Sequence, residues 1–289
     1  MHPAPSIILF TTLSGLGFGL LIWLGVDPTP PTGWVAFAFY AIAYALALSG
    51  LAASSFHLGR RDRALKAFRQ WRTSWLSREA WLAALALGVS GLHALGLLFG
   101  IALLPLGWLS AALSLATVAA TAMIYAQLRT VPRWYHWSTP ILFIALSLSG
   151  GALLSGRVEI ASGLLLLTGA LQFWVWYDGD RRFARSGTTL ASATGLGEQG
   201  VPRALFPPHT GSNYLLDEMV YVVARRHALK LRSIALVMMV LLPVLLLQLP
   251  MPHLFGLLAL ACHLAGVLTA RWLFFAEAEH VVGLYYGKR

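Results

Sequence analysis

Two long stretches of this chain contain no Asp, Glu, Lys or Arg, and they limit its fold more than any other feature. They are residues 80–128 and residues 233–270. A helix crosses the hydrocarbon core of a bilayer with about 20 apolar residues. Each stretch is long enough for two crossings, and a proline-containing break, PLG at 105–107 and PMP at 250–252, divides it. The pattern therefore predicts pairs of membrane helices.

Composition agrees with this class, because 58% of the residues are hydrophobic and only 11% are charged. A soluble domain carries about a quarter charged residues. We therefore expect one integral membrane domain, an all-α polytopic bundle of eight transmembrane helices. The expected spans are residues 6–25, 34–57, 79–103, 107–128, 137–155, 160–177, 232–249 and 253–275.

The basic residues are distributed unevenly over the two sides of this plan. With strict alternation, 20 of the 21 Lys and Arg residues fall on one side, and only Arg157 falls on the other. Lys and Arg accumulate on the cytoplasmic side of membrane proteins. We expect both termini and the large loops to be cytoplasmic, in a bacterial inner membrane. The net charge of +10 then reflects a basic membrane face and contact with lipid, with no role in binding nucleic acid.

The densest basic segment, residues 54–81, begins near His57 and ends near Glu79. Trp71 and Trp75 recur at helical spacing within it, which predicts a helix lying in the membrane interface. Such a helix binds anionic lipid, and it also offers a docking surface to a soluble partner. Seven basic residues lie between the two framing groups: Arg60, Arg61, Arg63, Lys66, Arg69, Arg72 and Arg78.

His57 and Glu79 are expected at the same depth, on consecutive spans. Each alone has a structural interpretation: a hydrogen-bonded histidine at the headgroup level, and an acid in a first helical turn capped by Ser77. Together they form a pair that can exchange protons near neutral pH. Two-electron, two-proton exchange with a lipid-soluble quinone needs such a pair at a membrane border. The single cysteine, Cys262, rules out thiolate-held clusters, so electrons must come from a partner and no metal site is expected.

Four neighbours are secondary candidates for the same quinone site. Arg63 and Arg72 could orient a quinone oxygen or pair with Glu79, and they could equally face lipid phosphate. Trp71 and Trp75 could stack near the ring, although tryptophan is common at membrane interfaces.

One loop is far longer than bundle connections require. Residues 178–231 run for about 50 residues and are rich in Gly, Ser, Thr and Pro in their first half. Long loops of this kind are usually functional or bound to a partner. We expect this loop to be the docking surface of a partner subunit.

The run HLGRRDRALKAFRQWRTSWLSREA resembles the membrane anchor subunits of the dimethyl sulfoxide reductase type, as do the eight-span plan and the opening HPAPSIILFTTLSGLGFGLL. The resemblance implies an anchor that binds quinone, ubiquinone or menaquinone, and holds an iron–sulfur subunit, which contacts a molybdopterin catalytic subunit. The family's quinol-site pair corresponds to His57 and Glu79 here, and Gly59 of the HLG motif joins the expected site. No haem is expected, and the chain alone should oxidise no substrate.

The long loop, in particular TTLASATGLGEQGVPRALFPPHTGSNYLLDEMVYVVARRHA, resembles the branch found in cytoplasmic sulfite-oxidising complexes. That branch implies electron flow from sulfite to quinone in sulfur respiration. Within the same family, the alternative is a reductase anchor that oxidises quinol. The sequence does not identify the quinone, the direction of electron flow or the substrate.

Three other interpretations stay open at this stage. A b-type haem anchor would need paired histidines at one depth, for which His93 and His263 are the candidates. A transporter would show inverted repeats and charges near the bilayer centre, which we do not find. A passive anchor would lack a quinone site altogether.

Overall fold

The computed structural model describes residues 1–56, 66–206, 211, 213–220 and 227–287. Within these ranges the chain is helical and contains no β-strand. His57, Gly59 and Arg63 of the expected quinone site lie outside the described residues.

Seven helical segments of the described part are long and apolar enough to cross a membrane. An eighth apolar helix, α5, has 17 residues and is shorter than these. The helices are α1 (Pro5–Gly25), α2 (Gly33–Ser55), α3 (Trp75–Leu98), α4 (Leu104–Ala126), α5 (Ser138–Leu154), α6 (Val158–Arg185), the continuous segment α8 (Ala228–Leu236), η5 (Val237–Leu241) and α9 (Leu242–Leu246), and α10 (Pro252–Ala276).

Several helix bounds differ from the expected spans, and the differences are largest in α3 and α6. Helix α3 spans Trp75–Leu98 where the sequence predicted 79–103, because Ser74 leaves helical geometry at one end and Gly100, with φ of 80°, follows the other. Ser77 is therefore not the N-cap. It is buried inside the first turn, where its hydroxyl accepts a hydrogen bond from the Gln70 amide at 3.0 Å.

Helix α6 continues to Arg185, where the sequence predicted an end at residue 177. Asp178 and Arg182 stabilise this extension as an i, i+4 ion pair of 2.6 Å. The long connection therefore begins at Ser186. Its described part holds the short elements α7 (Leu190–Thr194), η2 (Gly197–Gln199) and η3 (Leu215–Met219).

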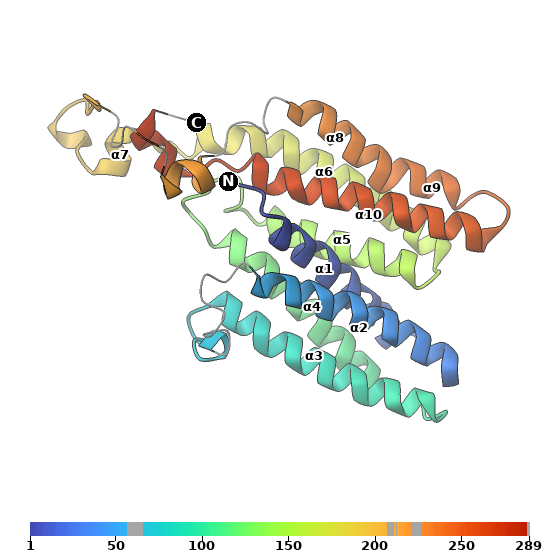
Figure 1. Ribbon diagram of the computed structural model, residues 1–289. Coiled ribbons are helices and arrows are strands. Elements are labelled where there is room, and N and C mark those ends of the chain that lie inside the picture. The colour runs from blue at the N-terminus through green and yellow to red at the C-terminus, as the bar shows by residue number, and fades with distance from the viewer. Residues whose placement is uncertain (57–65, 207–210, 212, 221–226, 288–289) are drawn as a thin grey trace.

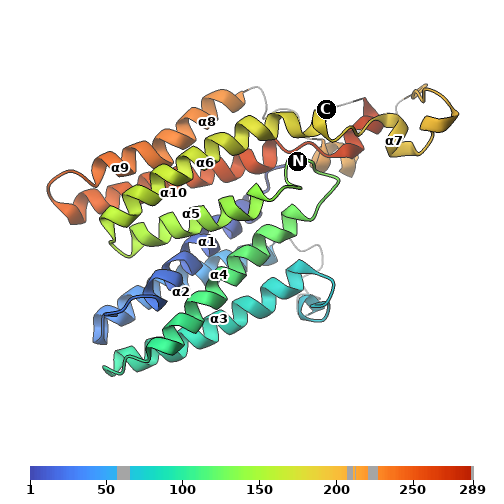
Figure 2. The same ribbon diagram turned by 180° about the vertical axis from the view of Figure 1, so that it is seen from behind.

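Helix α1 lies at the centre of the bundle and joins two groups of helices. It packs against α2 and α4 on one side and against α5 on the other (Figures 1 and 2). The approach to α5 is close, since a Cβ atom on Gly19 would clash with the backbone carbonyl of Ser147. Only glycine permits this contact.

The two ends of the bundle differ in character. One end, here called the polar end, carries the N-terminus, the segment 66–74, the loop 127–137, the connection containing α7, and the C-terminal turn η6 (Val281–Tyr286) (Figure 1). At the other, the short-turn end, the described residues form only the connections 26–32, 99–103, 155–157 and 247–251. Arg157 lies at the short-turn end, as the charge count predicted.

Candidate functional site

Glu79 lies near the polar end, on the face of α3 that packs into the bundle. The buried residues of this helix recur at helical spacing, and Glu79 shares their face with Ala83, Ala86, Ser90 and His93. Its side chain is only 4% exposed. A buried carboxyl in an apolar helix is costly unless another group compensates it.

The compensating partner is a hydroxyl group on the neighbouring helix. Thr121 of α4 donates a hydrogen bond to Oε1 of Glu79, and its hydroxyl also lies 3.0 Å from the carbonyl oxygen of Thr117. Among the described residues, no Lys or Arg lies within ion-pair distance of Glu79. A guanidinium would hold this carboxyl as an anion, whereas a hydroxyl partner leaves it able to take up and release a proton.

An open groove of about 550 Å³ lies beside this position, on the outer face of α3. Its walls are largely aromatic, and it is lined by Phe68, Trp71, Trp75, Arg78, Trp81, Leu82 and Leu85. Wide, mostly apolar clefts with a few polar groups are typical of small-molecule sites.

Side-chain contacts hold the walls of this groove in place. The guanidinium of Arg78 lies 4.4 Å from the ring centroid of Trp75 and donates to the carbonyl oxygens of Trp71 and Arg72 at 3.0 and 2.7 Å. The indole of Trp81 donates to the carbonyl oxygen of Phe68 at 3.0 Å. These bonds anchor residues 66–73 to α3. The segment 66–73 forms one 3₁₀ turn followed by irregular turns, so the prediction of an interfacial helix was wrong for these residues.

The structure brings together only part of the expected quinone site. Trp71 and Trp75 meet in the groove, and the exposed Arg72 places its guanidinium 5.5 Å from the Trp71 ring. Glu79 follows Arg78 in the helix, about 100° further round its axis, and does not line the groove. It therefore lies behind the groove wall, on the buried side.

Sequence reasoning missed Phe68, Arg78, Trp81 and Thr121. The three tryptophans between residues 71 and 81 were a usable signal, but the helix assumed for this segment separated them onto different elements. No sequence signal identified Thr121, because it depends on how α3 and α4 align.

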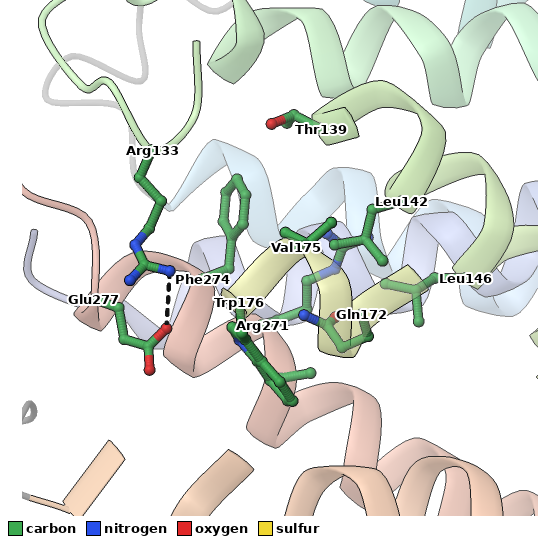
Figure 3. A pocket seen from close by; sticks show the side chains of 11 residues that line it. Arg133, Thr139, Leu142, Leu146, Gln172, Val175, Trp176, Arg271, Phe274 and Glu277 are labelled. Carbon is green, nitrogen blue, oxygen red and sulfur yellow. Dashed lines mark ion pairs between the residues drawn. The ribbon is translucent and has the colours of Figure 1, made fainter. Parts of the chain in front are cut away.

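A second buried glutamate lies across the bundle. Glu277, at the C-terminal end of α10, bonds to Arg232 at 2.7 Å and lies 3.3 Å from Arg133. Both arginines also pair with Asp180 of α6. Figure 3 shows the Arg133–Glu277 pair on the wall of a small chamber that Gln172 and Arg271 also line. The chamber holds about 20 Å³, which is room for a water molecule.

The two histidines considered as haem ligands lie in different helix interfaces. His93 of α3 packs beside Gly107 of α4 and lies edge-on to Tyr40 of α2. His263 of α10 lies beside Gly150 of α5, with its Nδ1 2.8 Å from the carbonyl oxygen of Met239. Among the described residues, no three His, Cys, Asp or Glu side chains gather to hold a metal ion.

Comparison with known proteins supports the resemblance drawn from the sequence. Residues 1–174 match the family described as DMSO reductase anchor subunit (DmsC). The chain is 31% identical to a sulfite dehydrogenase subunit of Allochromatium vinosum, over 99% of its own length and 99% of that protein. No solved structure matches it.

Proposed function

This chain belongs to the family of DMSO reductase anchor subunits, and from that premise we propose that it is the quinone-reactive anchor of a molybdopterin oxidoreductase complex. Its partners are an iron–sulfur subunit and a molybdopterin catalytic subunit. The sulfite dehydrogenase subunit among its relatives favours sulfite as the electron donor of the complex and quinone as the acceptor.

The observation that carries this proposal is the buried Glu79 carboxyl, whose described partner is a hydroxyl group. A passive anchor has no need for such a residue. A quinone that accepts two electrons must also accept two protons, and a carboxyl near the membrane border can supply them one at a time. His57 completes the proposed pair, from a position outside the described residues.

The aromatic groove suits the ring of the quinone. It opens sideways from the bundle, so a lipid-soluble carrier can enter from the bilayer. Trp71 and Trp75 offer flat apolar faces, and the guanidinium of Arg78 offers donors to a carbonyl oxygen at the groove wall. In this proposal the ring lies near Glu79, and because Glu79 does not line the groove, a bridging water carries the proton between them.

The polar end suits the docking of the iron–sulfur subunit. The connection after α6 exposes large apolar side chains there, with Val201 96% and Phe206 83% exposed. Exposed apolar groups on a basic face are typical of a protein interface. The proposal places this face in the cytoplasm of a bacterium, with both termini, and it counts α5 as the eighth crossing of the inner membrane.

The test uses the purified complex and two assays, sulfite oxidation with a quinone and with a soluble artificial acceptor. We expect Glu79→Gln to lower quinone-linked turnover by about a hundredfold, the scale of a lost general acid, and to leave the artificial-acceptor rate unchanged. Glu159→Gln, which removes an exposed carboxyl from the start of α6, is the matched control.

The groove has its own variant in the same assays. Trp75→Leu should raise the KM for quinone with little change in artificial-acceptor activity, because stacking on an aromatic ring is lost. Full quinone turnover in Glu79→Gln would reduce the chain to a passive anchor. A complex that accepts electrons from quinol but does not oxidise sulfite would instead favour a reductase of the dimethyl sulfoxide type.

A further inference from the structure

A row of hydroxyl groups runs along the inward face of α4, starting from the partner of Glu79. Its members are Ser110, Ser114, Thr117 and Thr121, each three or four residues from the next. All are nearly inaccessible, with exposed fractions of 0%, 0%, 0% and 6%. The row therefore leads from the Glu79 carboxyl toward the short-turn end.

Several polar atoms along this row lack a hydrogen-bond partner. They are Oγ of Ser110, Oγ of Ser114, Nδ1 of His93 and Oη of Tyr40. The described part of the chain holds nine such buried atoms. Two of these four belong to the row itself, His93 of α3 lies beside Gly107, about one helical turn before Ser110, and Tyr40 of α2 lies edge-on to His93. Buried polar atoms in native proteins are bonded to protein or to ordered water. Their concentration here indicates internal water.

The spacing of the row fits single bridging waters. Side chains three or four residues apart on a helix are separated by about 5–6 Å. A water that bonds two hydroxyl groups at about 2.8 Å each spans about the same distance. Water between successive hydroxyls would thus satisfy the unpartnered atoms and make the row continuous.

At its far end the row approaches the short-turn end. His93 lies beside Gly107 of α4 and edge-on to Tyr40, with ring centroids 6.2 Å apart. Tyr40 lies seven residues inside α2, about 10 Å from the start of that helix at Gly33, which follows the short-turn connection 26–32. Asp27 is 20% exposed at the short-turn end and forms a 2.7 Å ion pair with Arg157. The 14 residues from Glu79 to His93 correspond to about 21 Å along α3, roughly two-thirds of a bilayer core.

We propose that these groups conduct protons between Glu79 and the short-turn end of the protein. The inference rests on the proposed quinone chemistry and extends it. When quinone takes two electrons it also takes two protons, and the row supplies one of them to Glu79. Each hydroxyl, water and imidazole along it accepts one proton and passes one on, so the row itself is left unchanged.

The test reconstitutes the complex in vesicles and measures quinone-linked turnover against an imposed membrane potential. Moving one charge across a full membrane is equivalent to about 2.3 kcal/mol per 100 mV. A proton that crosses two-thirds of the membrane should therefore change the rate of quinone reduction by on the order of tenfold per 100 mV when proton transfer limits turnover. A pH dye on the short-turn side should report one proton taken up per quinone reduced.

We expect Ser110→Ala with Ser114→Ala, and separately His93→Leu, to abolish both the potential dependence and the dye signal. The matched controls are Ser149→Ala on α5 and His263→Leu on α10, which remove a fully buried hydroxyl and a fully buried imidazole elsewhere. The serine variants preserve packing, so they report on the row even where the histidine variant folds poorly.

The outcomes separate this inference from the proposed function. One possible result is that the wild-type complex reduces quinone with no response to potential and no proton uptake at the short-turn side. That result would contradict the proton route and leave the proposed quinone site standing. An unchanged potential dependence and dye signal in the serine variants would also contradict the proton route. Loss of the potential dependence and the dye signal in the row variants, with both retained in the control variants, would establish the route.

Discussion

The chain buries two glutamates near its polar end and surrounds them differently. Glu79 and Glu277 are 4% and 5% exposed, so burial alone does not distinguish them. The carboxylate of Glu277 faces two arginines that share Asp180 as a further partner, whereas Glu79 faces a threonine hydroxyl. One is a fixed charge within an ion-pair network. The other can change its charge without leaving a cation unpaired.

This difference assigns separate roles to the two halves of the bundle. The network around Glu277 connects the loop before α5 to α6, α8 and α10, and it stabilises their arrangement. The surroundings of Glu79 contain hydroxyl groups that continue along α4. Stability should therefore depend on Glu277, and turnover on Glu79.

The largest expected effect is on stability. Glu277→Gln removes the more deeply buried of the two anions that Arg133 and Arg232 share, and it should destabilise the protein by about 3 kcal/mol, as expected when one member of a buried ion pair is lost. Glu79→Gln should cost about 1 kcal/mol or less, because the amide oxygen can still accept from Thr121. Thermal unfolding in detergent measures both. Equal losses in the two variants would contradict the comparison.

A smaller effect is expected from the hydroxyl partner of Glu79. Thr121→Val keeps the shape of the side chain and removes its donor. We expect quinone-linked turnover to fall by about tenfold, less than the hundredfold or more that a general acid itself contributes, because Thr121 acts only through Glu79. Thr121→Ser restores the hydroxyl and should restore most of the rate. Comparable losses in both variants would indicate that packing, and not the hydrogen bond, determines the role of this position.

The smallest expected effect is on the pH dependence of stability, in the half of the bundle that contains Glu277. Ser138 connects His136 to the Arg182–Asp178 ion pair. The Ser138 amide donates a hydrogen bond to Nδ1 of His136 at 3.2 Å, and the Ser138 hydroxyl accepts one from Arg182. Burial lowers the pKa of His136, and the Arg182 guanidinium lowers it further, against an opposing contribution from Asp178. The folded state thus binds fewer protons than the unfolded state as the pH falls below about 6.5.

The stability that His136 contributes is therefore present above about pH 6.5 and is lost on acidification. His136→Gln should flatten the decline in melting temperature between about pH 7 and pH 5.5, the range around the ordinary histidine pKa. An unchanged pH profile would show that other groups cause the decline.

Charge and proline patterns were enough to locate the helices, and side-chain patterns were not enough to build the site. The uncharged stretch 80–128 does contain most of two helices, α3 and α4, since lipid excludes charges from both, although α3 begins and ends earlier than predicted. The extension of α6 to Arg185 was missed because its charged residues are typical of a loop by hydropathy. In the structure these charges form ion pairs within α6 and with α8, so the helix continues.

Glu79 was identified because an acid near the start of an apolar run is unusual. Its burial and its bond to Thr121 depend on the alignment of α3 with α4, which the short connection at 99–103 sets. The aromatic groove was missed for a related reason. It forms because residues 66–73 fold back onto α3, so that Phe68 meets Trp81 across 13 positions of sequence.

The central position of α1 also constrains how the protein is made. This helix precedes all its partners along the chain, and an 18-residue window of it has a mean hydropathy of 2.1, which is typical of a membrane span. Its glycine contacts with α5 form only after more than a hundred further residues have been synthesised. The seam that Gly19 forms with Ser147 is therefore completed late in synthesis, and its closure joins the two halves of the anchor into one unit.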